Sequence, residues 1–171
     1  ICFRDEWSKQ KFPELTKVRF APDIVLGIQS IIPNANEKKK RIFVSVVDCF
    51  KKGEAIKKYG TNYEEFILRC INYYKEQGYE IILSSFCKME GDEEVIDRII
   101  EKLPATKRSE LSILNYNGEN WREVVAAIQQ SEKIIASRFH SMILGMVFGV
   151  SVLPIAYNKK FEKFLANFDL S

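Results

Sequence analysis

One short segment of the sequence combines residue types that can bind an anion and move a proton. Ser137, Arg138 and His140 stand together between two apolar runs, at 133–136 and 142–148. A guanidinium can pair with a phosphate or carboxylate through two parallel hydrogen bonds. A histidine exchanges a proton near neutral pH, and His140 is the only histidine in the 171 residues. The segment therefore predicts an anion-binding site with an acid–base group beside it.

The backbone at this segment favours the same kind of ligand. If a strand at 133–136 leads into a helix at 138–148, Ser137 is suited to cap that helix. The amides that follow would then point outward at the positive end of the helix dipole, which is a ready anion site. The competing interpretation is that Arg138 pairs with a surface carboxylate and His140 caps or packs.

Two further segments could contribute to a site at the ends of strands. The run 157–160 ends in two lysines, of which Lys160 could reach the same pocket or remain a solvated surface residue. Asp92 follows Gly91 and precedes two glutamates. We expect Asp92 to cap a helix, because acidic residues stabilise a helix N-terminus; contact with a sugar or base hydroxyl is the alternative.

The elements that must position these residues alternate regularly from residue 41 onward. β-branched runs of strand length are each followed by a segment with helical periodicity or a largely apolar helix. Five such units predict an α/β fold, Rossmann-like, with a parallel sheet and helices on both faces. Ligands of such sheets bind beyond the carboxyl ends of the strands. The expected strands are 41–47, 80–84, 111–114, 133–136 and 152–156, and the expected helices are 62–77, 92–103, 120–130, 138–148 and 159–167.

The first forty residues are less regular. Residues 1–3 resemble the end of a strand, residues 4–8 begin a helical turn, and 22–27 predicts a second short strand. The polar run 33–40 contains a proline and ends in lysines, which is typical of a linker.

Composition excludes several classes of protein. The net charge of +3 gives no argument for a nucleic-acid partner. Four separated cysteines and a single histidine exclude the usual zinc ligand set, so we expect no metal and interpret the thiols as small buried apolar groups in a reducing compartment. The apolar stretch 142–157 is shorter than the ~20 residues of a spanning helix. It contains Gly145 and Gly149, four residues apart, which we expect to allow close packing on one helix face.

Several motifs together resemble the polysaccharide pyruvyl transferase family. The most specific is Arg138-Phe139-His140 before an apolar helix and Gly149-Val150, although Ser151 replaces the usual proline and Phe139 the common leucine. The remaining matches are Tyr157 with Lys160, Arg4-Asp5 with Ser8, Pro22-Asp23, and Gly91-Asp92.

The resemblance implies a two-lobed fold like that of the glycosyltransferase-B proteins. Residues 1–31 would be a remnant of the N-terminal lobe, 32–40 a linker and 41–171 the C-terminal lobe. The implied enzyme transfers a pyruvyl group from phosphoenolpyruvate to a sugar of a polysaccharide or its precursor, forming a ketal without any cofactor. Arg138 and His140 would be catalytic. Substrate would be bound by Ser137, Phe139, Arg138, Tyr157, Lys160 and Arg4.

Two other functions remain open from the sequence. One is a glycosyltransferase that uses a nucleotide-sugar, with Arg138 on the diphosphate, and the other is a non-catalytic carbohydrate-binding module. For the pyruvyl transferase we expect phosphoenolpyruvate and a sugar or lipid-linked oligosaccharide as partners, with neither nucleic acid nor a membrane-spanning segment. The expected location is the cytoplasm, including the inner face of the membrane.

Overall fold

The computed structural model describes residues 1–33 and 37–166. The chain divides into two compact units, Ile1–Asn34 and Ala35–Ser171. The second unit carries the sheet and nearly all of the predicted site residues.

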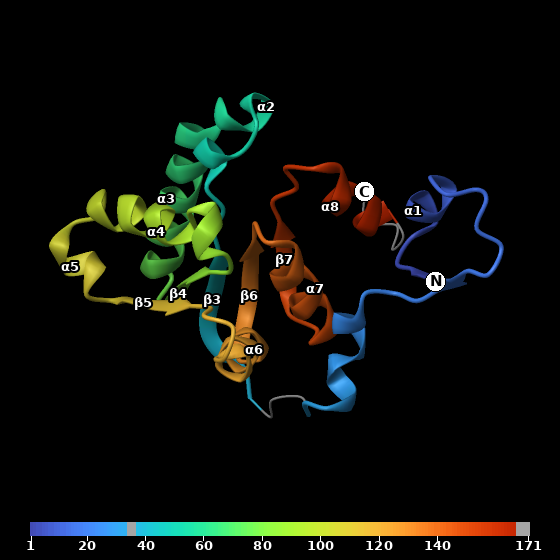
Figure 1. Ribbon diagram of the computed structural model, residues 1–171. Coiled ribbons are helices and arrows are strands. Elements are labelled where there is room, and N and C mark those ends of the chain that lie inside the picture. The colour runs from blue at the N-terminus through green and yellow to red at the C-terminus, as the bar shows by residue number, and fades with distance from the viewer. Residues whose placement is uncertain (34–36, 167–171) are drawn as a thin grey trace. The chain divides into compact units, whose positions relative to one another are not determined.

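The second unit is built on five parallel strands in the order β5-β4-β3-β6-β7 (Figure 1). β3 is central and pairs with β4 on one side and with β6 on the other. The predicted parallel sheet is confirmed. The expected linker ends earlier than predicted, because its last two lysines already belong to β3. The strands are β3 (Lys39–Ser45), β4 (Glu80–Ser85), β5 (Leu111–Asn115), β6 (Ser131–Ala136) and β7 (Ser151–Pro154).

The helices of this unit follow the strands as the sequence predicts. The expected helix at 92–103 ends two residues early, at Glu101, and a short helix that the sequence did not predict follows Pro104. The last residue expected in the final helix, 167, lies outside the described residues. The helices are α2 (Glu54–Lys57), α3 (Gly60–Glu76), α4 (Asp92–Glu101), α5 (Ala105–Arg108), α6 (Trp121–Gln129), α7 (Phe139–Val147) and α8 (Lys159–Ala166).

Helices cover both faces of the sheet because alternate residues of a strand point to opposite faces. Ile42 and Val44 of β3 lie in one buried cluster with Ile67 of α3 and Ile99 of α4. Ser45, the next residue of β3, contacts α7 instead. α3 and α4 therefore cover one face, and α6 and α7 cover the other (Figure 1).

One of the two glycines expected to allow close packing does so. A Cβ on Gly145 of α7 would lie 2.7 Å from Val152 Cγ2 of β7 and 3.1 Å from Ile134 Cδ1 of β6. The prediction for Gly149 is wrong, since this residue lies beyond the end of α7 with φ of +62°. Its left-handed conformation turns the chain toward β7, a conformation that glycine adopts without steric cost.

The first unit contains two short parallel strands and two short helices. The strand predicted at 22–27 is wrong. The Asp23 carboxylate accepts a hydrogen bond from the Val25 amide at 3.2 Å and so begins a 3₁₀ helix. A short apolar run does not by itself distinguish a strand from a helix. The elements are β1 (Cys2–Phe3), α1 (Glu6–Gln10), β2 (Arg19–Phe20) and η1 (Ile24–Ser30).

Candidate functional site

The candidate site lies where β3, β4 and β6 end, at the carboxyl edge of the sheet. Two one-turn helices, η2 (Cys49–Lys51) and η3 (Lys88–Glu90), follow β3 and β4. Arg138 follows β6 and stands directly before α7. Since β3 lies between β4 and β6, the three segments converge at the centre of this edge.

Arg138 is held by two carboxylates. Its Nε donates to Asp92 Oδ2 at 2.8 Å and its Nη2 donates to Asp92 Oδ1, while Nη1 donates to Glu90 Oε2. The side chain is 11% exposed. Burial alone would lower the pKa of Arg138, but hydrogen bonds and charge from Asp92 and Glu90 outweigh it and raise that pKa. The guanidinium is a fixed cation with all three nitrogens engaged by carboxylates, not the open anion fork that the sequence suggested.

Asp92 anchors Arg138 to the end of β4. Its carboxylate is fully buried, and Oδ2 also accepts hydrogen bonds from the amides of Phe86 and Cys87, both at 3.0 Å. The expected helix cap is wrong: Gly91, with φ of +85°, occupies the capping position and Asp92 is the first residue of α4. The Asp92 carboxylate accepts from the buried guanidinium and from two amides that follow β4, and not from the amides in the first turn of α4.

Glu90 connects Arg138 with a second cation. Its Oε2 accepts from Lys52 Nζ as well as from Arg138 Nη1. Hydrogen bonds from Lys52 and then Arg138 lower the pKa of Glu90 to about 2. The Glu90 side chain is 47% exposed, whereas that of Lys52 is 20% exposed. Neither residue was singled out from the sequence, because only the fold brings them to Arg138.

A buried hydroxyl network fixes the backbone that leads into α7. Ser45 Oγ accepts hydrogen bonds from the amides of Ser137 and Arg138 at 3.1 and 3.2 Å. It also shares a 2.6 Å hydrogen bond with Ser141 Oγ, which donates to the Arg138 carbonyl at 2.7 Å. Ser137 is therefore not the helix cap, and the Arg138 amide is directed to the central strand. The sequence predicted that the amides after Ser137 would point outward to an anion. The Arg138 amide does not, because it donates to Ser45 Oγ.

The Ser137 side chain continues the network on the other side of the sheet. Its Oγ lies 2.8 Å from the hydroxyl of Tyr63, which also accepts from the Val47 amide at 3.1 Å. Burial raises the pKa of Tyr63 well above its ordinary value, so this phenol remains neutral. Ser137 is fully buried and serves to position the segment, rather than presenting a hydroxyl at the surface.

The predicted aromatic and basic residues come together at the start of α7. His140 is exposed in the first turn, and its ring centroid lies 5.8 Å from that of Phe139. Lys160 Nζ of α8 lies 3.7 Å from the centroid of the Phe139 ring. Phe161 packs edge-on against the same ring at 5.6 Å. Phe139 is thus the common contact of the imidazole and the ammonium group.

Tyr157 lies beside the charged group of residues. Its ring is 6.0 Å from Lys52 Nζ and 5.5 Å from the ring of Phe161. Burial raises the pKa of Tyr157, and the nearby Arg138 partly opposes this shift. The half-buried phenol therefore connects the charged residues with the aromatic group around Phe139.

Arg4, the remaining predicted residue, belongs to the first unit. It pairs with Asp23 at 2.9 Å. Asp5 accepts hydrogen bonds from both the amide and the hydroxyl of Ser8, at 2.7 and 3.0 Å. The two N-terminal motifs of the sequence are therefore joined by one ion pair, which spacing along the chain did not reveal.

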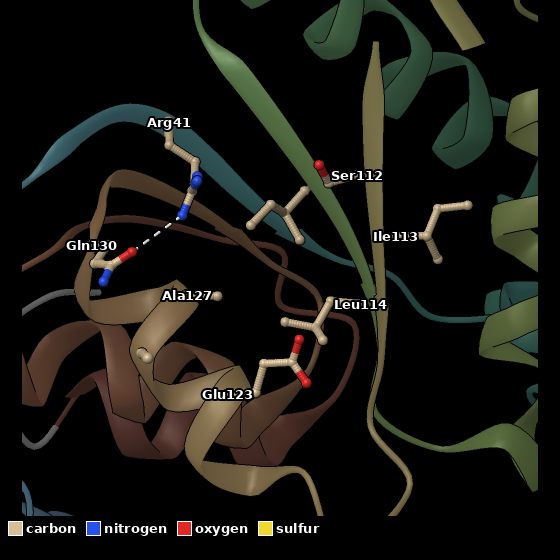
Figure 2. Close-up of a pocket in the computed structure, with 9 residues that line it drawn as sticks. Arg41, Ser112, Ile113, Leu114, Glu123, Ala127 and Gln130 are labelled. Atoms are coloured by element: carbon tan, nitrogen blue, oxygen red, sulfur yellow. Dashed lines mark hydrogen bonds between the residues drawn. The ribbon is translucent and has the colours of Figure 1, made fainter. Parts of the chain in front are cut away.

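A separate hollow of about 270 Å³ lies between α6 and strands β3, β4 and β5. Figure 2 shows Arg41 and Gln130 directed toward each other on one side of it, with Arg41 Nη1 3.5 Å from Gln130 Oε1. Glu123 and Leu114 lie on its other side (Figure 2). The predicted site residues do not line this hollow.

Within residues 1–33 and 37–166, no three His, Cys, Asp or Glu side chains are grouped so that they could hold a metal ion. Among the helices of the same residues, none has the length and apolar character needed to cross a bilayer.

Comparison with known proteins places the chain in a family. No match was found among the curated proteins. Among solved structures, the chain is similar to the ADP-heptose lipopolysaccharide heptosyltransferase II of E. coli, at 14% identity and a TM-score of 0.47. That similarity covers 78% of this chain and 38% of the heptosyltransferase. The sequence model of the polysaccharide pyruvyl transferase family matches residues 1–159. This match confirms the resemblance drawn from the Arg138-Phe139-His140 motif, and the chain belongs to the polysaccharide pyruvyl transferase family.

Proposed function

We propose that this chain takes part in the transfer of a pyruvyl group from phosphoenolpyruvate to two hydroxyls of one sugar. The products are a cyclic ketal and inorganic phosphate. The observation that carries the proposal is the position of Arg138 and His140 at the start of α7, on the carboxyl edge of the sheet, in a chain of this family. Residues 41–171 would then be the C-terminal lobe of a two-lobed transferase.

The site holds three cationic side chains that suit an anionic donor. Phosphoenolpyruvate carries a phosphate and a carboxylate on three carbons, and an anionic ligand requires fixed cations. Arg138 is a permanent cation held by the buried Asp92, and Lys52 lies beside it. Lys160, stacked on Phe139, supplies a third positive charge from α8. We assign the anionic groups of the donor to these side chains, with Tyr157 beside them.

The proposed chemistry needs one proton donor and no cofactor. One sugar hydroxyl bonds through its oxygen to the central carbon of the donor and gives up its proton, while the methylene carbon gains a proton and becomes a methyl group. The second hydroxyl then forms the other carbon–oxygen bond as the bond to phosphate breaks, and its proton leaves with the phosphate. His140 is the proposed general acid, protonating either the methylene carbon or the departing phosphate. The donor's own carboxylate, attached to the same carbon, stabilises the oxocarbenium-like character that this carbon acquires as its bonds form and break in the two steps.

The test is pyruvyl transfer with the full chain and a competent acceptor sugar. We expect His140→Ala to reduce the rate by about a hundredfold or more, as is usual for loss of a general acid. Glu101→Ala, at the exposed far end of α4, is the control and should retain the rate. Full activity of the His140→Ala variant would show that His140 is not the general acid.

A binding measurement separates the proposed donor from the alternative one. Calorimetry should detect phosphoenolpyruvate and not nucleotide-sugars. Binding of a nucleotide-sugar in preference to phosphoenolpyruvate would instead indicate a glycosyltransferase. If no acceptor leads to phosphate release, a non-catalytic carbohydrate-binding role is favoured.

A further inference from the structure

We propose that Glu90 is a placeholder for the anionic group of the donor. Its carboxylate occupies an anion subsite formed by Lys52 Nζ and Arg138 Nη1, and a phosphate or carboxylate oxygen of the ligand displaces it on binding. This inference rests on the proposed function for the identity of the ligand. The subsite itself is argued from the side chains alone.

The geometry of the contact is that of a bound anion. A single oxygen, Glu90 Oε2, accepts hydrogen bonds from both Lys52 Nζ and Arg138 Nη1. The two cationic groups are therefore already spaced to share one negatively charged oxygen. Phosphate and carboxylate oxygens accept the same charge-assisted hydrogen bonds from these donors. A ligand oxygen at the position of Oε2 would keep both contacts.

The two carboxylates on Arg138 differ in a way that suits displacement. Asp92 is fully buried and is held by two backbone amides as well as by Nε and Nη2 of Arg138. Glu90 is 47% exposed and contacts only Nη1 of the guanidinium. When Glu90 leaves, Asp92 therefore keeps the guanidinium in place. Asp92 is a positioning residue in this arrangement, and Glu90 is the exchangeable partner.

Glu90 lies on a surface turn outside the sheet. Glu90 ends the one-turn helix η3 at the surface, where the neighbouring Met89 is 94% exposed. The next residue, Gly91, has φ of +85° and separates η3 from α4. Rotation about the side-chain bonds of the half-exposed Glu90 would carry its carboxylate into solvent while Asp92 remains in α4.

Lys52 is the new binding residue in this proposal. It follows η2 at the end of the central strand, and its side chain is 20% exposed. The ring of Tyr157, to which the family resemblance gives a role in substrate binding, lies 6.0 Å from Lys52 Nζ. A ligand that replaces Glu90 would therefore also lie near Tyr157.

The test is the affinity of the chain for three anions, measured by calorimetry: inorganic phosphate, pyruvate and phosphoenolpyruvate. Glu90→Gln removes the competing charge while preserving size, and Lys52→Gln removes one of the two cations. Matched controls come from the neighbouring surface ion pair of Lys51 and Glu94, which lie 2.9 Å apart and do not contact Arg138. These controls are Glu94→Gln and Lys51→Gln.

We expect Glu90→Gln to bind inorganic phosphate about tenfold more tightly than the unaltered chain, because the subsite is no longer occupied by its own carboxylate. Lys52→Gln should bind about tenfold more weakly, through loss of a charge-assisted hydrogen bond. The two controls should remain within about twofold, as expected for a surface pair. Pyruvate compared with phosphate identifies which anionic group of phosphoenolpyruvate takes the subsite.

Unchanged or weaker phosphate binding by Glu90→Gln would overturn the proposal, since Glu90 would then be a structural brace for Lys52 and Arg138. Circular dichroism verifies that each variant is folded, and Glu90→Asp repeats the test with a carboxylate that is retained but shortened. Phosphate binding does not depend on pyruvyl transfer. If Glu90→Gln binds phosphate more tightly but the chain transfers no pyruvyl group, the proposed function is overturned and the anion subsite is supported.

Discussion

Arg138 and Asp92 form a two-point ion pair that joins the segments following β6 and β4, the strands on either side of the central β3. The two residues are 46 positions apart in the chain. The pair is almost entirely shielded from water, with side chains 11% and 0% exposed. It therefore links the two halves of the sheet at the edge where the candidate site lies.

Removing the carboxylate of this pair should destabilise the protein. We expect Asp92→Ala to lower the free energy of unfolding by about 3–5 kcal/mol, because the buried guanidinium and two amides lose their acceptor. Urea denaturation measures the change. Asp97→Ala, at an exposed position of the same helix, is the control. A loss of less than about 1 kcal/mol, the size usual for a surface substitution, would show that the ion pair contributes little to stability.

The ion pairs of Glu90 should make stability depend on pH in the acid range. The pKa of Glu90 is lowered to about 2 in the folded chain by Lys52 and then Arg138, against about 4.3 in an unfolded chain. A lowered pKa means that the contribution is complete above the unfolded value and is lost as pH falls toward the folded value. The difference in urea midpoint between the unaltered chain and Glu90→Gln should therefore shrink between about pH 5 and pH 2. The exposed Glu119→Gln should show no comparable trend, and a difference that grows toward acid pH would contradict the assignment.

A methyl group at Gly145 should disturb the packing of α7 on the sheet. Its Cβ would lie 2.7 Å from Val152 Cγ2, closer than two carbon atoms can pack. We expect Gly145→Ala to cost about 1–3 kcal/mol of stability, as overpacking usually does. Gly53→Ala is the control, because a Cβ there meets no atom within 4 Å. Equal thermal midpoints for the two variants would contradict the prediction and show that the side chains of β6 and β7 shift to accommodate the added methyl group.

The cysteines should differ strongly in reactivity. Burial, together with the charges of Asp48 and Glu64, raises the pKa of Cys49 to about 11. Because the thiolate is the reactive form, Cys49 should resist iodoacetamide at about pH 8. Cys2 is exposed, contrary to the expectation of buried thiols, and should be modified first. Mass spectrometry of peptides follows the time course, and labelling in urea provides the fully reactive reference.

The fold was predictable because the three central strands each contain an unbroken apolar run and every strand of the sheet is followed by a helix. The run Ile81-Ile82-Leu83 is buried on both faces of the sheet, and such strands need no alternation of polar residues. The run Ile24-Val25-Leu26 is similar in composition but forms a 3₁₀ helix, because the preceding Asp23 caps it. The hydrogen bond from the Val25 amide to Asp23, and not the strand propensity of the apolar residues, determines the conformation of this segment.

The site was predictable only in part, for a different reason. The motif Arg138-Phe139-His140 is local and could be read from the chain. The partners of Arg138 are 46 and 48 residues away, and nothing along the sequence pairs them with it. The match of Gly91-Asp92 to the family was a usable signal for Asp92, although it did not pair this carboxylate with Arg138. Lys52 offered no such signal.

The strand order also determines when the site is completed during folding. β3, β4 and β5 pair in the order in which they occur, whereas β6 returns to the opposite side of β3. Ser45 receives its hydrogen bonds from Ser137 across 92 residues, so this closure has the larger entropic cost. A nascent chain that ends after β5 can form one half of the sheet but lacks Arg138. The anion subsite is therefore complete only once β6 has paired with β3.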